Sequence, residues 1–320
     1  MDKNAEVKRR LDEQLRFYLG PLILDALNHE KTTEVYLNQD GRLWWKRHGE
    51  AKALLGEMDT LTATNIITSV ADREGRVANI SQPSVQGILP LDGSRFQGVL
   101  PPTAMQPIFL IRKKARVIYT LENYERDGII TAEQRELLED AIEKRLNILV
   151  VGGTGSGKTT LLNALLHRIG VVDPDCRVGI IEDTLELQYD DLEDVNVLLT
   201  NDATDMDGAI RMFLRLSPDR LFVGEMRGKE AYTLLKVWNS GHKGGAATIH
   251  SDDPLSGLMQ LEYYIQEVSL SPQHKMIANV VDVIVSIQKD PSHKAGRRIT
   301  DMLRLTGYED GQYQYQLYGR

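Results

Sequence analysis

The feature that most constrains the fold of this chain of 320 residues is a glycine-rich loop between a short apolar segment and a helical pattern. Residues 147–151 are apolar after the first, which indicates a buried strand. The leucines after the loop recur at helical spacing: Leu161, Leu162, Leu165 and Leu166. The loop itself matches G-x-x-x-x-G-K-[ST], with Gly152, Gly157, Lys158 and Thr159 at the fixed positions. This order of elements predicts an α/β protein that binds a nucleoside triphosphate.

Each residue type in the loop has a physical role in binding phosphate. Glycine permits turns in which successive N–H groups point at phosphate oxygens, and the following helix adds the positive end of its dipole. Lys158 is expected to reach the β- and γ-phosphates, and the Thr159 hydroxyl is expected to bind Mg²⁺. The predicted nucleotide-binding residues are Gly152, Gly153, Thr154, Gly155, Ser156, Gly157, Lys158, Thr159 and Thr160.

The charge of the chain argues against one class of partner. The net charge is −8, and the sequence has no block of consecutive basic residues. A protein that binds duplex DNA without sequence preference normally presents a basic face. We therefore expect no direct binding to duplex DNA. The sequence also lacks an Asn-Lys-x-Asp motif for reading guanine, so ATP is the expected nucleotide.

Cysteine usage and hydropathy predict the compartment. Cys176 is the single cysteine, which excludes an intramolecular disulfide and a multi-cysteine zinc site and fits a reducing cytosol. We expect it to be a small, partly buried residue ahead of a strand. No apolar run approaches the ~20 residues that span a bilayer, and residues 1–10 are too charged for a signal peptide. The sequence thus predicts a cytoplasmic protein, which could still sit on a membrane through partners.

Residues 1–118 are predicted to form a small α+β domain with an antiparallel sheet. A helix over residues 5–27, interrupted at Gly20-Pro21, would pack on its own domain; contact with a membrane surface or a partner is the alternative. Four leucines share its apolar face: Leu11, Leu15, Leu19 and Leu22. The other expected elements are a hairpin, a helix, a second hairpin and a strand: residues 34–37 with 42–46, 62–73, 86–90 with 94–100, and 108–112.

Residues 119–130 are polar and are expected to be a linker. Thr131 followed by Gln134 forms a capping box, which predicts a helix start and opens a second domain over residues 131–320. From there strands and helices alternate, which indicates a mostly parallel sheet with right-handed crossovers. The expected strands are residues 147–151, 177–182, 220–225, 246–250, 280–288, 298–305 and 313–317.

Carboxylates follow two of these strands. The apolar segment that begins at residue 221 ends in Glu225, which places this carboxylate at the edge of the sheet where the phosphates are expected. Glu182, Asp183 and Glu186 follow another strand directly, although a solvated turn is the alternative. A site that transfers phosphate needs such groups to orient a metal ion and the attacking water.

Histidines and arginines supply the remaining candidates. His242 and His250 bracket a glycine-rich segment and a strand, whereas an isolated histidine is usually structural. Arg95 and Arg112 lie in the first domain, where an arginine is ordinarily a surface residue of little energetic consequence. Cations of this kind could instead neutralise phosphate charge in a transition state.

Taken together, these segments resemble the secretion ATPase family, which includes hexameric motors of type IV secretion, type II secretion and type IV pili. The second domain carries four motifs of this family. The first is the glycine-rich loop described above, called the phosphate loop from here on. The others are Ile-Glu-Asp-Thr-x-Glu-Leu from residue 181, Leu-Arg-Leu-x-Pro-Asp-Arg-Leu-x-Val-Gly-Glu-x-Arg-Gly from residue 214, and Gly-His-x-Gly…Thr-x-His-Ser from residue 241. Gly-Ser-Arg-Phe from residue 93 and Phe-Leu-Ile-Arg-Lys from residue 109 resemble the type IV secretion branch, which includes conjugal-transfer ATPases. The missing zinc-binding cysteine cluster argues against the type II branch.

The resemblance implies a RecA-like P-loop NTPase domain preceded by the smaller α+β domain. It also implies that Glu225 orients or activates the attacking water and that His250 senses the γ-phosphate. Thr159, Glu182 and Glu225 would bind Mg²⁺, with a looser assignment for Glu225 because most P-loop enzymes have aspartate there.

The resemblance further implies that Arg95 and Arg112 act on the phosphates of the same or a neighbouring subunit. It implies a homohexameric ATPase that works with inner-membrane components of a secretion or conjugation apparatus, driving pilus biogenesis and substrate transfer. A pilus-retraction or pilus-assembly motor of the type IV pilus system is the nearest alternative. A nucleotide switch without motor activity and a nucleic-acid translocase are further alternatives, since one core fold serves many tasks.

Overall fold

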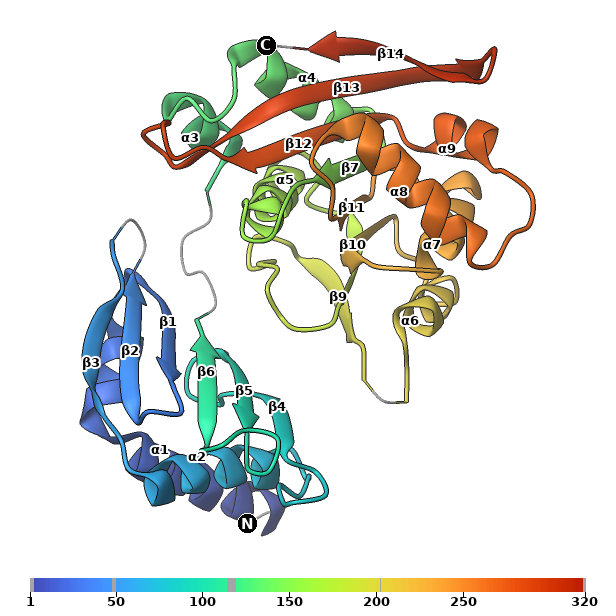
Figure 1. Cartoon of the computed structure of the whole chain (residues 1–320). Helices are drawn as coiled ribbons and strands as arrows, with labels where there is room; N and C mark the ends of the chain where they lie inside the picture. Colours follow the sequence, from blue (N-terminus) through green and yellow to red (C-terminus); the bar gives the residue numbers. More distant parts are fainter. Residues whose placement is uncertain (1–2, 48–49, 114–118, 202, 319–320) are drawn as a thin grey trace. The chain divides into compact units, whose positions relative to one another are not determined.

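The structure is a computed structural model that describes residues 3–47, 50–113, 119–201 and 203–318 (Figure 1). The chain divides into two compact units, Met1–Arg116 and Val117–Arg320. Each unit has its own sheet and its own hydrophobic core, so the chain contains two folds in series.

The first unit is an antiparallel sheet with two helices. Its elements are α1 (Lys3–Asn28), β1 (Thr32–Leu37), β2 (Arg42–Arg47), β3 (Ala53–Glu57), α2 (Thr60–Arg73), β4 (Ser84–Ile88), β5 (Arg95–Val99) and β6 (Ile108–Arg112). The strand order is β3-β2-β1-β6-β5-β4, and every neighbouring pair is antiparallel. Buried side chains of both helices share one core with those of the strands. This is the α+β arrangement that the sequence predicts, apart from β3, which it does not.

Helix α1 bends where the sequence predicts an interruption. Gly20 has φ 66° and ψ 170°, far from helical values, and Pro21 follows it. Leu15 and Leu19 are buried in the core of the unit, so this helix packs on its own domain. The prediction for Leu22 is wrong: beyond the bend this side chain is 45% exposed, and Ile23 is buried instead.

The second unit is a mixed, mostly parallel sheet with helices. Its elements are α3 (Leu121–Arg126), α4 (Ala132–Glu143), β7 (Ile148–Val151), α5 (Lys158–Val172), β8 (Arg177–Glu182), β9 (Asp194–Leu199), α6 (Met206–Phe213), β10 (Arg220–Met226), α7 (Glu230–Asn239), β11 (Ala246–Ile249), α8 (Pro254–Gln266), α9 (His274–Val280), β12 (Val283–Lys289), β13 (Arg297–Glu309) and β14 (Gln312–Tyr318). The strand order is β14-β13-β12-β7-β11-β10-β8-β9. Strands β12 to β9 in this order are parallel, and β13 and β14 add an antiparallel edge. The predicted fold class is confirmed.

The strands of the second unit differ from the prediction in two main respects, besides shifts at strand ends such as β13, which extends to Glu309. Strand β9 is not predicted from the sequence. The strand expected from residue 280 begins at Val283, because α9 continues to Val280. Asp282, between the two, accepts a hydrogen bond from the backbone N–H of Asn147 just before β7 at 2.8 Å. This contact fixes where β12 starts beside β7.

Strand β7 lies inside the second sheet and is covered on both faces (Figure 1). Ile148 and Val150 belong to one core, together with side chains of α4 and α5. Leu149 and Val151 belong to the other, together with side chains of α7 and α8. A parallel strand buried on both faces is apolar at every position, which explains why this segment shows no alternation.

Residues 119–130, expected to be a linker, pack into the second unit. Helix α3 lies within them, and four of their apolar side chains are buried in the core: Leu121, Tyr124, Ile129 and Ile130. Burial of these side chains stabilises the segment in spite of its polar composition. Thr131 and Gln134 then form the predicted capping box of α4, with both reciprocal hydrogen bonds present.

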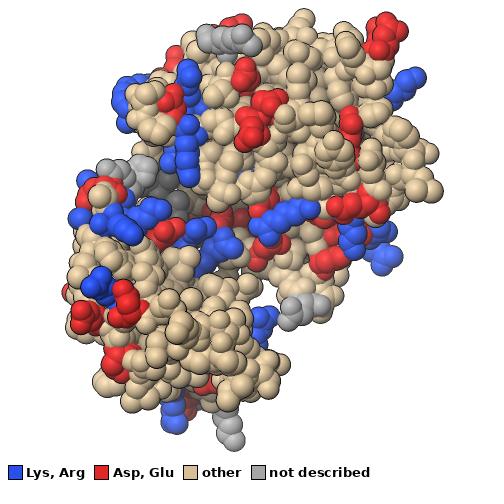
Figure 2. Space-filling model, in the orientation of Figure 1, with Lys and Arg blue, Asp and Glu red and all other residues tan. Residues whose placement is uncertain are grey.

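Cys176 lies just before β8 and is 2% exposed, more deeply buried than predicted. Among the described residues, no helix has the length and apolar character needed to span a bilayer. Figure 2 shows acidic and basic side chains intermixed on the visible face of each unit.

Candidate functional site

The phosphate loop joins β7 to α5 at the carboxyl end of the second sheet. Gly155 and Gly157 have positive φ angles of 68° and 114°, and Gly157 immediately precedes the helix. A Cβ atom at Gly152 would lie 2.3 Å from the carbonyl oxygen of Ile287. Conformation or space therefore requires glycine at all three positions. The loop ends at the amino terminus of α5, where free N–H groups and the helix dipole favour an anion.

Lys158, the first residue of α5, is only 7% exposed. Its ammonium group donates to the carbonyl oxygens of Gly152 and Gly153 at 2.9 and 3.2 Å. Burial lowers the pKa of this ammonium group, and the nearby carboxylate of Glu225 opposes that effect. Lys158 is thus a partly desolvated cation directly beside the loop, held by two of the loop's carbonyl oxygens.

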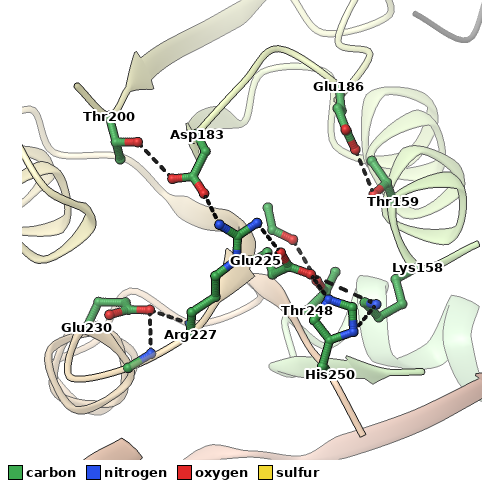
Figure 3. A network of polar contacts seen from close by, with 12 residues as sticks. Lys158, Thr159, Asp183, Glu186, Thr200, Glu225, Arg227, Glu230, Thr248 and His250 are labelled. Carbon is green, nitrogen blue, oxygen red and sulfur yellow. Dashed lines mark hydrogen bonds and ion pairs between the residues drawn. The ribbon is translucent and has the colours of Figure 1, made fainter. Parts of the chain in front are cut away.

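Glu225, in β10, is the centre of a polar network (Figure 3). Its Oε1 lies 2.7 Å from His250 Nε2 and 4.0 Å from Lys158 Nζ. The other ring nitrogen of His250, Nδ1, lies 3.3 Å from Lys158 Nζ. An ammonium group can only donate, so Nδ1 accepts and Nε2 carries the proton that it shares with Glu225. A carboxylate, an imidazole and an ammonium group therefore form a closed triangle next to the phosphate loop.

Arg227 binds the same carboxylate from the other side (Figure 3). Its Nε donates to Glu225 Oε2 at 2.7 Å, and its Nη2 contacts the same oxygen. Its Nη1 lies 2.9 Å from Asp183, which also accepts from the Thr200 hydroxyl at 2.7 Å. Glu230 accepts from the backbone N–H of Arg227. The guanidinium group thus bridges Glu225 in β10 and Asp183, which directly follows β8, and so holds the Glu225 carboxylate in place.

Two carboxylates, one at the end of β8 and one in the turn after it, make different contacts. Glu186 Oε2 accepts from the Thr159 hydroxyl at 3.1 Å. Glu182 is 3% exposed, and its Oε1 accepts from the backbone N–H groups of Glu186 and Leu187 at 3.0 and 2.9 Å. Glu182 therefore holds the turn that carries Glu186, and Glu186 is the carboxylate that reaches the loop threonine.

Sheet topology explains why residues so distant in sequence meet. Strands β8, β10, β11 and β7 are successive parallel neighbours, so their carboxyl ends lie at one edge. The Thr248 hydroxyl of β11 donates to the carbonyl oxygen of Gly224 in β10 at 2.7 Å, which ties the two strands together one residue before Glu225. The predicted residues Lys158, Thr159, Glu225 and His250 are thus gathered at one place.

Two cavities flank this network within the second unit. One of about 440 Å³ is lined by Gly153, Thr154, His250, Ser251, Asp252, Ser256 and Gln260. The other, of about 260 Å³, is lined by Asp183, Asp205, Met206, Asp207, Glu225, Arg227, Lys229 and Glu230. The first cavity is bordered by the phosphate loop, and the second is lined in part by Glu225 and Arg227.

Arg95 and Arg112 lie side by side within the first unit. They are direct cross-strand partners in the β5–β6 pair. The Arg112 side chain is 50% exposed and contacts Glu34 Oε1 through Nε and Nη2 at 3.2 and 3.1 Å. The neighbouring strands of the first sheet thus present these two cations together.

Arg227, which contacts the Glu225 carboxylate directly, is not among the site residues predicted from the sequence. It lies two positions after Glu225 and inside the pattern Gly-Glu-x-Arg-Gly. Arg227 lies just beyond the end of β10, close enough along the chain for its side chain to contact the Glu225 carboxylate. That spacing is the signal that could have identified it.

Comparison with known proteins shows the family of this chain. Residues 91–301 match the family described as type II/IV secretion system protein. The chain belongs to this family. It is 41% identical over 307 residues to the probable conjugal transfer protein TrbB of Sinorhizobium fredii, covering 96% of this chain and 93% of that protein. It is 40% identical over 311 residues to the conjugal transfer protein TrbB of Rhizobium radiobacter, covering 97% and 95%. The predicted membership of the secretion ATPase family is confirmed.

A solved structure supports the fold. The crystal structure of the pilus retraction motor PilT with bound ADP matches with a TM-score of 0.63 and 18% identity. The match covers 93% of this chain and 82% of PilT. At this identity the likeness concerns the fold alone. The conjugal-transfer proteins are therefore the nearer guide to function.

Proposed function

We propose that this protein is the ATPase motor of a type IV secretion or conjugation system, hydrolysing ATP to ADP and phosphate to drive pilus biogenesis and substrate transfer. The main support is the convergence of Lys158, Thr159, Glu225 and His250 at the carboxyl edge of one parallel sheet. The whole-length relatedness to proteins named for conjugal transfer adds the biological context.

The network suggests a role for each of its groups. The N–H groups of residues 152–160 and the Lys158 ammonium group bind the phosphates of the substrate. Glu225 orients or activates the attacking water as a general base. His250, bonded to both Glu225 and Lys158, senses whether the γ-phosphate is present. Arg227 holds the Glu225 carboxylate in its place.

The residues present also fit Mg²⁺, which prefers oxygen ligands from hydroxyl groups, carboxylates and substrate phosphates. The Thr159 hydroxyl lies 3.1 Å from Glu186, so a hydroxyl and a carboxylate already meet beside the phosphate loop. Thr159 would hold the ion, with Glu182 and Glu225 as the further predicted ligands and Glu186 joined to the set. When bound, the ion would neutralise charge on the phosphates.

Three parts of the proposal come from the family. The active form is a homohexamer. The protein works in the cytoplasm, against the inner membrane, through inner-membrane components of the secretion apparatus. Arg95 and Arg112 supply transition-state cations in the same or a neighbouring subunit.

A substitution at Lys158 tests the central assignment. The Lys158→Ala protein should lose ATPase activity by at least about 10³-fold, because the phosphates lose their buried cation. Lys236→Ala is the matched control, since Lys236 lies over the ring of Tyr232 and away from the network. A Lys158→Ala protein that still hydrolyses ATP at the wild-type rate refutes the proposed site.

Two measurements test the family-derived parts. Mass photometry with ATP should show a six-subunit species, and an active protein that stays monomeric contradicts the motor. Arg112→Ala should reduce kcat by about 10³-fold if the arginine acts on the transition state. Arg42→Ala, which removes an exposed arginine of β2 that contacts Asp40, is the control. A kcat unchanged by Arg112→Ala removes this residue from catalysis.

A further inference from the structure

Two cations from the other side of the phosphate loop also lie against its glycines. A Cβ atom placed at Gly157 would lie 2.6 Å from Arg297 Nη1, and one placed at Gly155 would lie 3.2 Å from Lys289 Nζ. Neither residue belongs to the network around Glu225. Lys289 ends β12 and Arg297 begins β13.

The pairing of the strands fixes this placement. Strand β12 runs parallel to β7, with Ser286 opposite Val151, so the next residues of β12 extend over the loop that follows β7. Lys289 and Arg297 are direct partners in the antiparallel β12–β13 pair. Strand pairing therefore places both cations beside the loop.

The two cations have no counter-ion in the part of the chain that the structure describes. No carboxylate there lies within ion-pair distance of Lys289 or Arg297, whereas the adjacent Arg298 contacts Asp290 at 2.9 Å. Like charges directly opposite each other on neighbouring strands are destabilising. A pair of unneutralised cations beside a phosphate-binding loop is the arrangement expected where a ligand supplies the anion.

The order of the strands indicates which part of a bound nucleotide Lys289 and Arg297 face. In the sequence β13-β12-β7-β11-β10, the loop follows the central strand β7. Glu225 and His250, which act on the terminal phosphate, come from the β11–β10 side. Lys289 and Arg297 come from the β12–β13 side. A nucleotide whose terminal phosphate points to Glu225 directs its nucleoside end toward the two cations.

We propose that Lys289 and Arg297 bind the nucleoside end of the nucleotide, contacting the phosphate next to the ribose and, through Arg297, the base. This inference rests on the proposed function. Arg297 is the stronger ligand, because it is partly buried and its planar guanidinium group can bond phosphate with two N–H groups and stack on a base. Lys289 is exposed and contributes a more weakly held charge.

Equilibrium binding of ADP, with Mg²⁺ present, tests the proposal without relying on turnover. Arg297→Ala should raise the Kd for ADP by about tenfold and Lys289→Ala by about threefold, since bonds from cations to phosphate are among the stronger ones. In steady-state assays the KM for ATP should rise by similar factors while kcat stays within about twofold, because these residues hold the end that does not react.

Two control variants separate the role in binding from a role in folding. Arg298→Ala removes the neighbouring cation of β13, which is 57% exposed and paired with Asp290, and should leave the Kd unchanged. Arg297→Lys keeps the charge and should recover part of the affinity that Arg297→Ala loses. A loss that Arg297→Lys does not recover at all, with a lowered melting temperature, would show that Arg297 only supports the fold.

The outcomes distinguish this inference from the proposed function. Wild-type protein that does not bind ADP overturns both. Wild-type protein that binds ADP, with both alanine variants binding as tightly, overturns this inference alone. A kcat that falls while the Kd for ADP stays constant also overturns it, because the cations would then act at the terminal phosphate.

Discussion

The two flanks of the phosphate loop differ in how their charges are satisfied. On the β10–β11 flank, Glu225, Arg227 and His250 contact one another or Lys158, and each charge has a protein partner. On the β12–β13 flank, Lys289 and Arg297 lie against the loop glycines, with no carboxylate partner among the described residues. Both flanks border the phosphate loop, but only on the β10–β11 flank are the charges paired within the protein.

Under the proposed function, the two flanks have different tasks. Groups that perform chemistry need fixed positions, and mutual hydrogen bonds hold the Glu225 carboxylate between His250 and Arg227. Groups that only bind an anion gain most when the anion is their main partner, because nothing has to be displaced. We therefore expect substitutions on the first flank to change kcat and those on the second to change affinity.

The largest effect within this comparison should come from Glu225→Gln. The amide keeps the size of the side chain but cannot accept a proton, so kcat should fall by about 10²-fold or more while the Kd for ADP stays within about twofold. Steady-state ATP hydrolysis and ADP titration on the same preparation measure the two quantities. A parallel loss of ADP affinity would break the separation between the flanks.

A smaller effect is expected from Arg227→Ala. The Glu225 carboxylate would keep His250 but lose the guanidinium group that fixes its other oxygen, and we expect kcat to fall by about tenfold. Arg227→Lys should recover little, since one ammonium group cannot bridge Glu225 and Asp183 in the same geometry. Arg211→Ala is the control, because Arg211 contacts Asp207 and not Glu225. Full activity in Arg227→Ala would mean that Glu225 is positioned without it.

The smallest effect should come from a change outside both flanks. Thr131→Ala removes the side-chain cap of α4 and should lower the local stability of this helix by about 1 kcal/mol. Hydrogen exchange of the α4 amide groups measures that loss, and Thr131→Ser should retain most of the protection. Both kcat and the Kd for ADP should remain unchanged. If either shifts, general loosening of the fold could mimic the effects assigned to the flanks.

Much of the fold could be predicted because local patterns and topology agree. The phosphate loop, the capping box at Thr131 and the bend at Gly20 each have a local chemical cause, and the structure has all three. Strand β9 shows no clear pattern because it begins with Asp194 and Asn196 interrupts its apolar residues, and β3 shows none because it is short and contains Gly56. Both are edge strands, whose burial is only partial and whose pattern is weak.

The residues of the candidate site could be predicted where they belong to a sequence motif. Lys158 opens a helix, Glu225 lies near the end of a strand and His250 follows one, each inside a recognisable pattern, and the sheet topology brings the three together. Lys289 and Arg297 belong to no such pattern. Their relation to the loop exists only because β12 pairs with β7 across more than a hundred residues of sequence, and no local spacing carries that information.

The deep burial of Cys176 has a practical consequence. Because burial also raises the pKa of this thiol, it offers little reactive thiolate to a maleimide reagent at neutral pH. The chain contains no other cysteine, so a thiol introduced at the exposed Lys294, in the connection between β12 and β13, would carry a fluorophore at a single known place. The molecule is thus ready for single-dye spectroscopy without first having its own sulfur removed.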